Sequence, residues 1–280
     1  GLFTQGMVCH ETYKDKKNNW LSPDEITVID GKKYSKKNPT ELVTTGPSES
    51  MSKSKKNTID PENIISQYGA DAVRLFILSD SPPEKDVQWS EEGISASYKF
   101  ISKLWNLNLA IIEEMEKNHS EDSDHSIDIY TNKFLSKIET NLNNFSYNVV
   151  IANLHEMYSF LVKETKKNYK KSTLKNNFEK ILICLIPIIP HFANECLENL
   201  GSSSEKKWPI YNKNLKGDDN INLVIQINGK KRALLSTKKD TEENKVYELI
   251  ANDEKIKKYI DGKNIKRKIY VKNRLVNIIV

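Results

Sequence analysis

The sequence predicts a mainly α-helical fold with α+β parts at the two ends of the chain. From Ser90 to Leu200, apolar residues recur every three or four positions, which is the spacing of a helix with one buried side. Beyond residue 216 the apolar residues alternate instead, and Asn228-Gly229 provides a two-residue hairpin turn. With 280 residues, 38% of them hydrophobic and 29% charged, the chain can bury cores in one large or two to three small domains.

The first 89 residues are assigned to one domain that carries a polar insertion. Leu2–Tyr13 has the composition of a strand. Residues from about 14 to 45 are polar and lysine-rich, with turn signals at Ser22-Pro23 and at Gly31. We therefore expect a short insertion between this strand and the segments that follow.

The run Ser50–Asn57 is the strongest candidate for chemistry. It surrounds lysines with small hydroxyl residues, and such a loop offers rotatable donors and positive charges that suit a mobile clamp on a polyphosphate. Asp60 can cap a helix that starts at Pro61. Gly69 can end this helix in a left-handed conformation, and Asp71 can start a second helix. These helices tether the loop, although a basic run taken alone is more often a solvated surface loop.

Residues 90 to 215 are expected to form an antiparallel bundle of helices and its linker. Ser90 can cap the first helix, because acidic residues fill the first turn after it. Pro187 and Pro190 should kink the last helix, since each removes a backbone donor. The three further helical segments are predicted at Ile129–Leu142, Tyr147–Tyr169 and Thr173–Leu200.

Four residues of this region fit structural roles. His191 has no carboxylate or cysteine at metal-ligand spacing, so a hydrogen-bonded structural role is favoured over a catalytic one. Trp105 and Tyr158 lie on core-facing stripes, and Cys184 lies in an apolar run, where it would be a small buried hydrophobe. The three cysteines are widely spaced and predict neither a disulfide framework nor a zinc site.

The remaining global features predict a cytoplasmic protein without a membrane segment. The apolar run Ile181–Ile189 is too short to span a bilayer and contains Pro187. The sequence opens on an apolar stretch without the basic region and cleavage site of a signal peptide. An odd number of unpaired cysteines fits a reducing compartment.

The segment 216–280 is expected to form a small basic ββαββ domain. It contains sixteen Lys and Arg against nine Asp and Glu, a net charge of +7, whereas the rest of the chain carries −2. Such a patch suits a phosphate backbone, with a solvated lysine-rich surface as the alternative. The predicted elements are strands Ile221–Ile227 and Lys230–Ser236, a helix Thr241–Ile260, and strands Ile265–Val271 and Leu275–Val280. The candidate phosphate-contacting residues are Lys230, Arg232, Lys266, Arg267, Lys272 and Arg274.

Several of these motifs together resemble one family. Ser50–Asn57 resembles the KMSKS loop of class I aminoacyl-tRNA synthetases, and Tyr68–Phe76 resembles the helix pair that follows it in the leucine, isoleucine, valine and methionine subgroup. The resemblance to bacterial leucyl-tRNA synthetases runs from the first residue to the last. It is carried by Gly1–Val8, Pro82–Ser90, Pro190-His191, Trp208-Pro209 and Val224–Val280. It implies the end of a Rossmann-like catalytic domain, a bundle of the anticodon-binding type, and a terminal domain that contacts tRNA.

The resemblance also implies an ATP-binding loop whose catalytic residue is Lys53. This lysine would support the phosphates of ATP while the carboxylate of the amino acid attacks the α-phosphorus. The family pattern starts with lysine where this chain has Ser50, so one cation is lost, and Lys55 or Lys56 could supply charge instead. The implied ATP-binding residues are Ser50, Met51, Ser52, Lys53 and Ser54.

For a complete enzyme, the resemblance implies activation of leucine by ATP, with Mg²⁺ accompanying the ATP, and transfer of leucine to tRNA(Leu). We expect this segment alone to be inactive, because it contains neither the HIGH-type signature of the ATP site nor an editing domain. No bound metal is predicted, and a monomer is expected. Alternatives are a valyl- or isoleucyl-tRNA synthetase fragment and a non-catalytic tRNA-binding module. The substitution at Ser50 supports the module, whereas the Gln5–Val8 opening and the basic terminus favour leucine.

Overall fold

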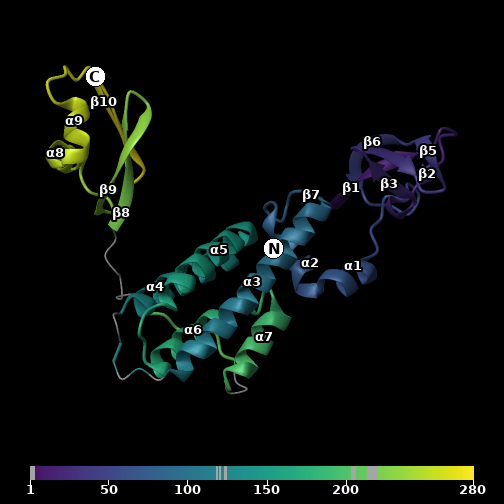
Figure 1. Cartoon of the computed structure of the whole chain (residues 1–280), viewed down its shortest axis with the longest axis horizontal. Helices are drawn as coiled ribbons and strands as arrows, with labels where there is room; N and C mark the ends of the chain where they lie inside the picture. Colours follow the sequence, from purple (N-terminus) through teal and green to yellow (C-terminus); the bar gives the residue numbers. More distant parts are fainter. Residues whose placement is uncertain (1–3, 118, 120, 123–124, 203–205, 213–219) are drawn as a thin grey trace. The chain divides into compact units, whose positions relative to one another are not determined.

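A computed structural model describes residues 4–117, 119, 121–122, 125–202, 206–212 and 220–280 (Figure 1). The chain divides into two compact units, residues 1–213 and 214–280, which are described separately. The start of the predicted opening strand, Leu2-Phe3, and the predicted start of the terminal domain at Lys216 lie outside the described residues.

The first unit begins with two small sheets. In the first, β1 lies between β2 and β6 in antiparallel pairing, and β7 pairs in parallel with the start of β1. In the second, β3, β4 and β5 pair in order within the predicted insertion. Asp30 and Gly31, between β3 and β4, have φ of 48° and 74°, as a type I′ turn requires. The strands are β1 Val8–Lys14, β2 Trp20–Leu21, β3 Ile26–Ile29, β4 Lys32–Ser35, β5 Asn38–Leu42, β6 Thr44–Ser50 and β7 Val87–Gln88.

The predicted strand Leu2–Tyr13 is too long at its start, because the described strand begins at Val8. Before that residue the backbone is held by a loop rather than by a strand. The amide of Gly6 donates to the carbonyl of Pro83 at 2.8 Å, and the amide of Met7 donates to the carboxylate of Asp86 at 2.8 Å. One backbone–backbone bond and one bond to a side chain therefore replace the strand ladder here.

Two helices, α1 (Pro61–Tyr68) and α2 (Ala70–Ser79), follow the loop after β6. The predicted cap is confirmed, since the side chain of Asp60 accepts from the amide of Glu62 at 3.0 Å. Gly69 has φ 82° and ψ 152°, so its φ is positive as predicted but its ψ is extended rather than left-handed helical. The predicted second helix is present, but it begins at Ala70 with Gly69 as its cap residue, so Asp71 lies in its first turn and does not start it.

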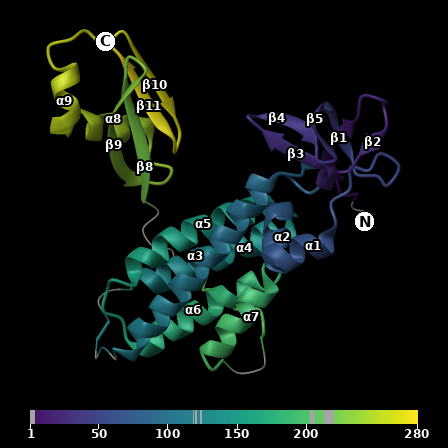
Figure 2. The same ribbon diagram turned by 45° about the vertical axis from the view of Figure 1, so that its right-hand side comes forward.

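Five helices, α3 to α7, share one hydrophobic core, and Figures 1 and 2 show α3 to α6 lying side by side. The predicted cap at Ser90 is confirmed, because its hydroxyl accepts from the amide of Gly93 at 3.1 Å. One side chain from each helix lies in this core at 2% exposure or less: Leu104, Ile138, Leu154, Ile181 and Cys196. The helices are α3 Glu91–Glu116, α4 Ser126–Asn143, α5 Tyr147–Glu164, α6 Lys171–Leu185 and α7 Pro190–Asn199.

The predicted last helix, Thr173–Leu200, is two helices rather than one kinked helix. Helix α6 ends at Leu185, and α7 starts with Pro190 as its first residue. Proline is favoured at that position because its missing N–H would be unpaired there in any case. Pro187 lies in the short turn between them, so the two prolines together end one helix and start the next.

The second unit is a four-stranded sheet in the order β10-β11-β8-β9, with helices packed on one face (Figure 1). Strands β8 and β11 are parallel neighbours, and the other pairs are antiparallel. Leu223, Ile225, Val276 and Ile278 of the central strands form the core with Val246 of α8. The elements are β8 Asn220–Ile227, β9 Lys230–Lys238, α8 Glu243–Asn252, α9 Glu254–Ile260, β10 Arg267–Val271 and β11 Leu275–Ile279.

Two helices stand where one was predicted at Thr241–Ile260. Asp253 has extended backbone angles, φ −81° and ψ 114°, and its side chain accepts from the amide of Lys255 at 2.8 Å. An aspartate that caps a new helix in this way ends the preceding one. The predicted hairpin is present, since Asn228 and Gly229 both have positive φ, 49° and 77°.

Candidate functional site

The loop after β6 begins at the end of a strand and closes through a tight turn. Ser50 is the last residue of β6 and pairs with Cys9 of β1. The amide of Lys56 donates to the carbonyl of Lys53 at 3.2 Å, and this bond closes a turn over residues 53 to 56. The turn places Lys53 and Ser54 at the exposed tip of the loop.

Met51 connects the loop to the helices beneath it. Its amide donates to the carbonyl of Val8 at 3.1 Å, and its half-buried side chain lines an apolar hollow of about 170 Å³. The other lining residues come from β1, the segment 59–64, α2 and the segment after β7: Val8, Ile59, Pro61, Ile64, Val73, Ile77 and Trp89. The base of the loop is therefore anchored by apolar packing, whereas its tip is polar.

Asn57 fixes the conformation of the loop from inside. Its side chain is fully buried, with 0% exposure. The amide oxygen accepts from the backbone N–H of Ser52 at 2.8 Å, and the amide nitrogen donates to the carbonyls of His10 at 3.2 Å and Glu49 at 3.1 Å. One side chain thus joins the loop, β6 and β1, and it satisfies polar backbone groups that would otherwise be unpaired. This structural role of Asn57 was not predicted from the sequence.

The three lysines of the loop have different electrostatic partners. The ammonium of Lys55 forms an ion pair with the carboxylate of Glu49, at the end of β6. In the described part of the chain, no ion pair or side-chain hydrogen bond is recorded for Lys53 or Lys56, and both are exposed. Lys55 and Lys56 were the two lysines predicted to replace the charge missing at Ser50. The charge of Lys55 is neutralised by Glu49, whereas Lys56 has no ion pair within the described residues.

Lys56 also has an unusual backbone conformation, with φ 54°. The left-handed region costs a residue with a Cβ roughly 1–2 kcal/mol relative to the right-handed one. Strain of this kind persists only where the surrounding contacts impose it, and it is concentrated at functional sites. Here the buried amide of Asn57 and the turn that closes on Lys53 impose it from both sides.

A second polar cluster joins α2 to the start of α7. The carboxylate of Asp71 accepts from the amide of Phe192 at 2.7 Å and from Nδ1 of His191 at 3.0 Å. The guanidinium of Arg74 donates to the carbonyls of Pro187 at 2.7 Å and Ile188 at 3.0 Å. His191 therefore has a hydrogen-bonded structural role, as predicted, but its partner is a carboxylate 120 residues away that no local spacing could reveal.

Single apolar residues behave as the sequence predicts. Trp105 and Tyr158 pack against the helical core, and Cys184 is buried at 1% exposure. Burial raises the pKa of the Cys184 thiol to about 12, so this thiol is protonated and unreactive at neutral pH. Across the described ranges, no three His, Cys, Asp or Glu side chains are arranged to hold a metal ion, and no helix is long and apolar enough to cross a membrane.

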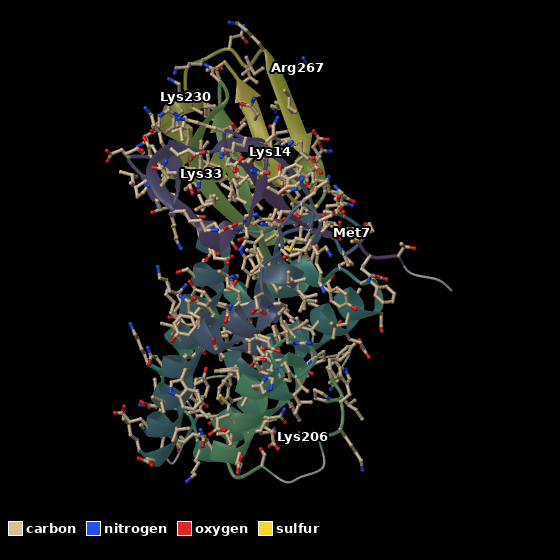
Figure 3. The ribbon with its side chains drawn as sticks, turned by 90° about the vertical axis from the view of Figure 1, so that its right-hand side faces the viewer. Met7, Lys14, Lys33, Lys206, Lys230 and Arg267 are labelled. Carbon is tan, nitrogen blue, oxygen red and sulfur yellow. The ribbon has the colours of Figure 1, made fainter. Side chains whose placement is uncertain are left out.

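The six basic candidates of the second unit occupy two opposite ends of its sheet. Lys230 follows the β8–β9 hairpin, and Arg267 at the start of β10 pairs with Ile279 at the end of β11 (Figure 3). Because β11 runs parallel to β8, these positions lie at the same end. The same end also holds Arg232, whose guanidinium lies 4.7 Å from the ring centre of Tyr259, and Lys266, whose amide donates to Ile279 at 2.8 Å.

Lys272 and Arg274 lie in the β10–β11 turn at the other end of the sheet. The two ends of a five-residue strand are roughly 13 Å apart, at about 3.3 Å per residue. Lys272 forms an ion pair with Asp240 at 3.1 Å. Its charge is therefore partly neutralised and attracts a phosphate less strongly. The structure therefore brings together four of the six candidates, and we name this set (Lys230, Arg232, Lys266 and Arg267) the hairpin-end cluster.

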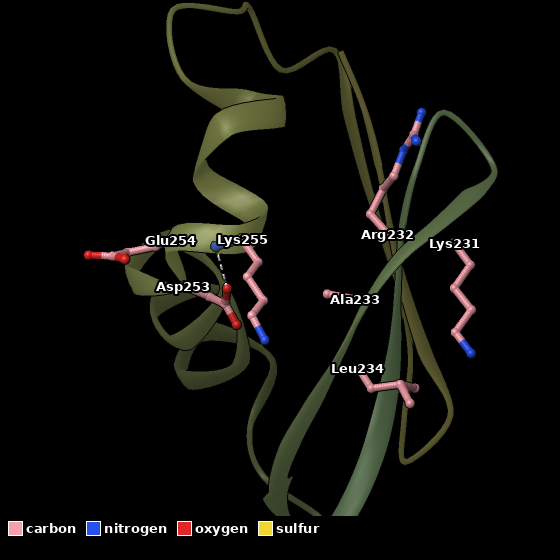
Figure 4. A pocket seen from close by; sticks show the side chains of 7 residues that line it. All are labelled: Lys231, Arg232, Ala233, Leu234, Asp253, Glu254 and Lys255. Carbon is pink, nitrogen blue, oxygen red and sulfur yellow. Dashed lines mark hydrogen bonds between the residues drawn. The ribbon is translucent and has the colours of Figure 1, made fainter.

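A groove of about 770 Å³ lies between β9 and the start of α9 (Figure 4). Its charges are mixed, because Asp253 and Glu254 contribute carboxylates where β9 contributes cations. In Figure 4 the side chain of Lys231 extends away from the α9 residues, and Asp253 is occupied by its cap hydrogen bond. The lining residues are Lys231, Arg232, Ala233, Leu234, Asp253, Glu254 and Lys255.

Two family models match parts of the chain. Residues 26–90 match the model of class I tRNA synthetases for isoleucine, leucine, methionine and valine. Residues 124–247 match the anticodon-binding domain of tRNA ligases, and this match continues into β8, β9 and part of α8.

Relatives that match the chain over its whole length include leucine–tRNA ligases. The chain is 39% identical to the leucine–tRNA ligase of Orientia tsutsugamushi over 288 aligned residues and 38% identical to that of Zymomonas mobilis over 282. Both alignments include all of this chain. The chain is a homologue of leucine–tRNA ligases. It spans about a third of the length of these ligases, 33% and 32% respectively.

A solved structure has a similar fold. It is a LeuRS of Agrobacterium radiobacter K84, crystallised as a ternary complex with tRNA and LeuAMS. The superposition has a TM-score of 0.60 and covers 82% of this chain and 30% of the LeuRS chain, at 22% sequence identity. At that identity the comparison concerns the fold alone.

Proposed function

We propose that this chain is the part of a leucine–tRNA ligase that holds ATP through the loop after β6 and binds tRNA through its helices and its C-terminal unit. The complete enzyme would activate leucine with ATP, release pyrophosphate, and transfer the leucine to tRNA(Leu). The observation that carries this proposal is the exposed Lys53, which has no ion pair within the described residues and lies at the tip of a loop held by Asn57. It occurs in a chain homologous to leucine–tRNA ligases over its full length.

Within this proposal the chain has three functional parts. Residues 1–89 are the end of a Rossmann-like catalytic domain with the insertion at about 14–45. Residues 90–215 are the antiparallel anticodon-binding bundle and its linker, and residues 216–280 are the basic C-terminal domain, which has two helices, α8 and α9, between its two pairs of strands. The family matches at 26–90 and 124–247 support the first two.

Lys53 has the catalytic role in this proposal. Its ammonium would contact the phosphates of ATP and stabilise the negative charge that develops as the leucine carboxylate attacks the α-phosphorus. The hydroxyls of Ser52 and Ser54, 3.3 Å apart, would donate to phosphate oxygens beside it. Met51 and Ser50 would position the loop from its base. Magnesium would enter with ATP and neutralise phosphate charge.

The second unit would contact tRNA through the hairpin-end cluster. Its cations would neutralise phosphates without reading sequence, so binding would weaken as salt rises. Lys272 and Arg274 lie at the other end of the sheet, and the ammonium of Lys272 is paired with Asp240. We therefore assign Lys272 and Arg274 a smaller part in tRNA binding than the hairpin-end cluster.

The role of Lys53 is tested in the full-length ligase. Lys53→Ala should lower the rate of leucine-dependent ATP–pyrophosphate exchange by about a hundredfold, which is the scale of one well-placed transition-state contact. Lys17→Ala, at an exposed lysine of the insertion, is the matched control and should leave the rate unchanged. An unaltered rate in Lys53→Ala would remove the catalytic assignment, and a wild-type enzyme that exchanges no pyrophosphate would overturn the proposed function.

A further inference from the structure

We propose that Lys56 replaces the lysine missing at position 50 and, together with Lys53, forms a two-cation contact with the triphosphate of ATP. The inference rests on the proposed function and adds a binding residue to it. Motif comparison leaves Lys55 and Lys56 as alternatives, and the structure distinguishes them because Lys55 is paired with Glu49.

The loop has more cations than carboxylates. Residues 49 to 57 contain one carboxylate, Glu49, and three lysines. Glu49 is occupied by Lys55, so this pair contributes no net charge to a ligand. The two cations that remain are those of Lys53 and Lys56, both exposed and, in the described part of the chain, without a recorded ion pair. A polyanion approaching the loop would therefore be attracted by these two side chains.

The backbones of Lys53 and Lys56 lie close together. Lys53 and Lys56 are the first and last residues of the turn that the 3.2 Å backbone hydrogen bond closes. The ends of a turn of this kind lie within about 7 Å of each other, so the two ammonium groups can reach neighbouring phosphates of one chain. Ser50, by contrast, is fixed in the last pair of β6 with β1, at the base of the loop.

The backbone of Lys56 has a strained conformation. Its φ of 54° is one that glycine adopts without strain and that a lysine adopts at a cost. Asn57 is buried directly after it, so the chain cannot relax this angle without losing the hydrogen bonds of that amide. A cation held at a strained position beside the candidate catalytic lysine indicates a function for its side chain.

The experiment compares Lys56→Gly with Lys56→Arg in the full-length ligase, with KM for ATP measured by pyrophosphate exchange. The glycine variant relieves the strain but removes the charge, whereas the arginine variant keeps both. We expect Lys56→Gly to raise the KM for ATP about tenfold, the scale of one charged hydrogen bond, and Lys56→Arg to stay within about twofold. The thermal midpoint of Lys56→Gly should be equal to or above that of the wild type, so the loss cannot be attributed to unfolding.

A further variant asks whether Lys56 stands in for the missing lysine. Adding Ser50→Lys to Lys56→Gly should recover most of the lost ATP affinity. A double variant no better than Lys56→Gly would overturn the replacement. An unchanged KM in Lys56→Gly, or an equal rise in Lys56→Arg, would overturn a role for the charge. If Lys53→Ala still abolishes exchange in that case, the proposed function stands without the role of Lys56.

Discussion

The buried amide of Asn57 shows how one side chain determines the conformation of a polar loop. Its oxygen and nitrogen bind the backbone of Ser52 in the loop, His10 in β1 and Glu49 in β6. A hydrophobic residue of the same size would leave these groups unpaired. The loop therefore depends on the chemistry of the amide and not on its volume.

Asn57→Ala should lower the free energy of unfolding by about 1–3 kcal/mol, because it leaves buried backbone groups without partners. Asn57→Asp is the sharper variant, since it keeps an acceptor for Ser52 but turns the donors toward the carbonyls of His10 and Glu49 into repulsive oxygens. It should be at least as destabilising as alanine. Urea unfolding monitored by circular dichroism measures both, and an aspartate variant as stable as the wild type would contradict this account.

Glu25 provides a pH-dependent contact in the insertion. The hydrogen bond from Lys37 and the bonds from Ser22 lower the pKa of the Glu25 carboxyl to about 2, from an ordinary 4.5. Because the folded-state pKa is lowered, the contact stabilises fully above pH 4.5 and is lost as the pH falls toward 2. The carboxyl ¹³C shift of Glu25 should titrate with this low pKa, and in Lys37→Ala the midpoint should move back up. A midpoint near 4.5 in the wild type would contradict the pairing.

At the scale of elements, α7 is held to α2 by polar groups as well as by packing. Asp71 caps the first amides of α7, and Arg74 binds the carbonyls that the break before Pro190 leaves without helical partners. Two residues of α2 thus bind the turn between α6 and α7 and the start of α7. This arrangement lets two prolines divide the predicted helix without leaving unpaired buried groups.

Asp71→Ala should destabilise the first unit by about 1–3 kcal/mol, because it removes a buried helix cap. Asp71→Asn keeps an acceptor oxygen and should cost less. Asp60→Ala, at the exposed cap of α1, is the matched control for loss of an ordinary cap and should cost about 1 kcal/mol. Thermal unfolding of the three variants measures the order, and an Asp71→Ala variant no worse than Asp60→Ala would contradict it.

The sequence predicted those elements whose signals are local. Asp60, Ser90 and the Asn228-Gly229 turn were identified correctly because a cap or a turn depends on a few neighbouring residues. The sequence did not reveal that Asp71 faces α7, because its partner is 120 residues away. The grouping of the basic residues was missed for the same reason, since it follows from the parallel pairing of β8 with β11.

At the scale of the whole molecule, the two units would separate two activities. The loop with Lys53 lies in the first unit, and the hairpin-end cluster lies in the second. Deleting residues 216–280 from the full-length ligase should reduce tRNA charging sharply while ATP–pyrophosphate exchange stays within a few fold. Equal loss of both activities would show that the C-terminal unit supports the fold rather than tRNA binding.

Salt dependence tests the hairpin-end cluster within the intact ligase. Replacing Lys230, Lys266 and Arg267 by alanine should reduce the slope of log affinity for tRNA against log salt by about one for each phosphate contact removed. Lys272→Ala, at the opposite end beside Asp240, should change the slope little. A Lys272→Ala effect as large as that of the average cluster residue would contradict the division of the sheet into two ends.

The parallel pairing of β8 with β11 also has a consequence for the order of events during synthesis. These strands are the first and last of the C-terminal unit, yet they are neighbours at the centre of its sheet. As the ribosome makes the chain, β8, β9 and both helices emerge first, but the edge of β8 that pairs with β11 has no partner strand until β11 arrives. Closing so long a loop is slow compared with hairpin formation, so this unit completes its folding late. Until then, its exposed strand edge is a site where a chaperone could bind.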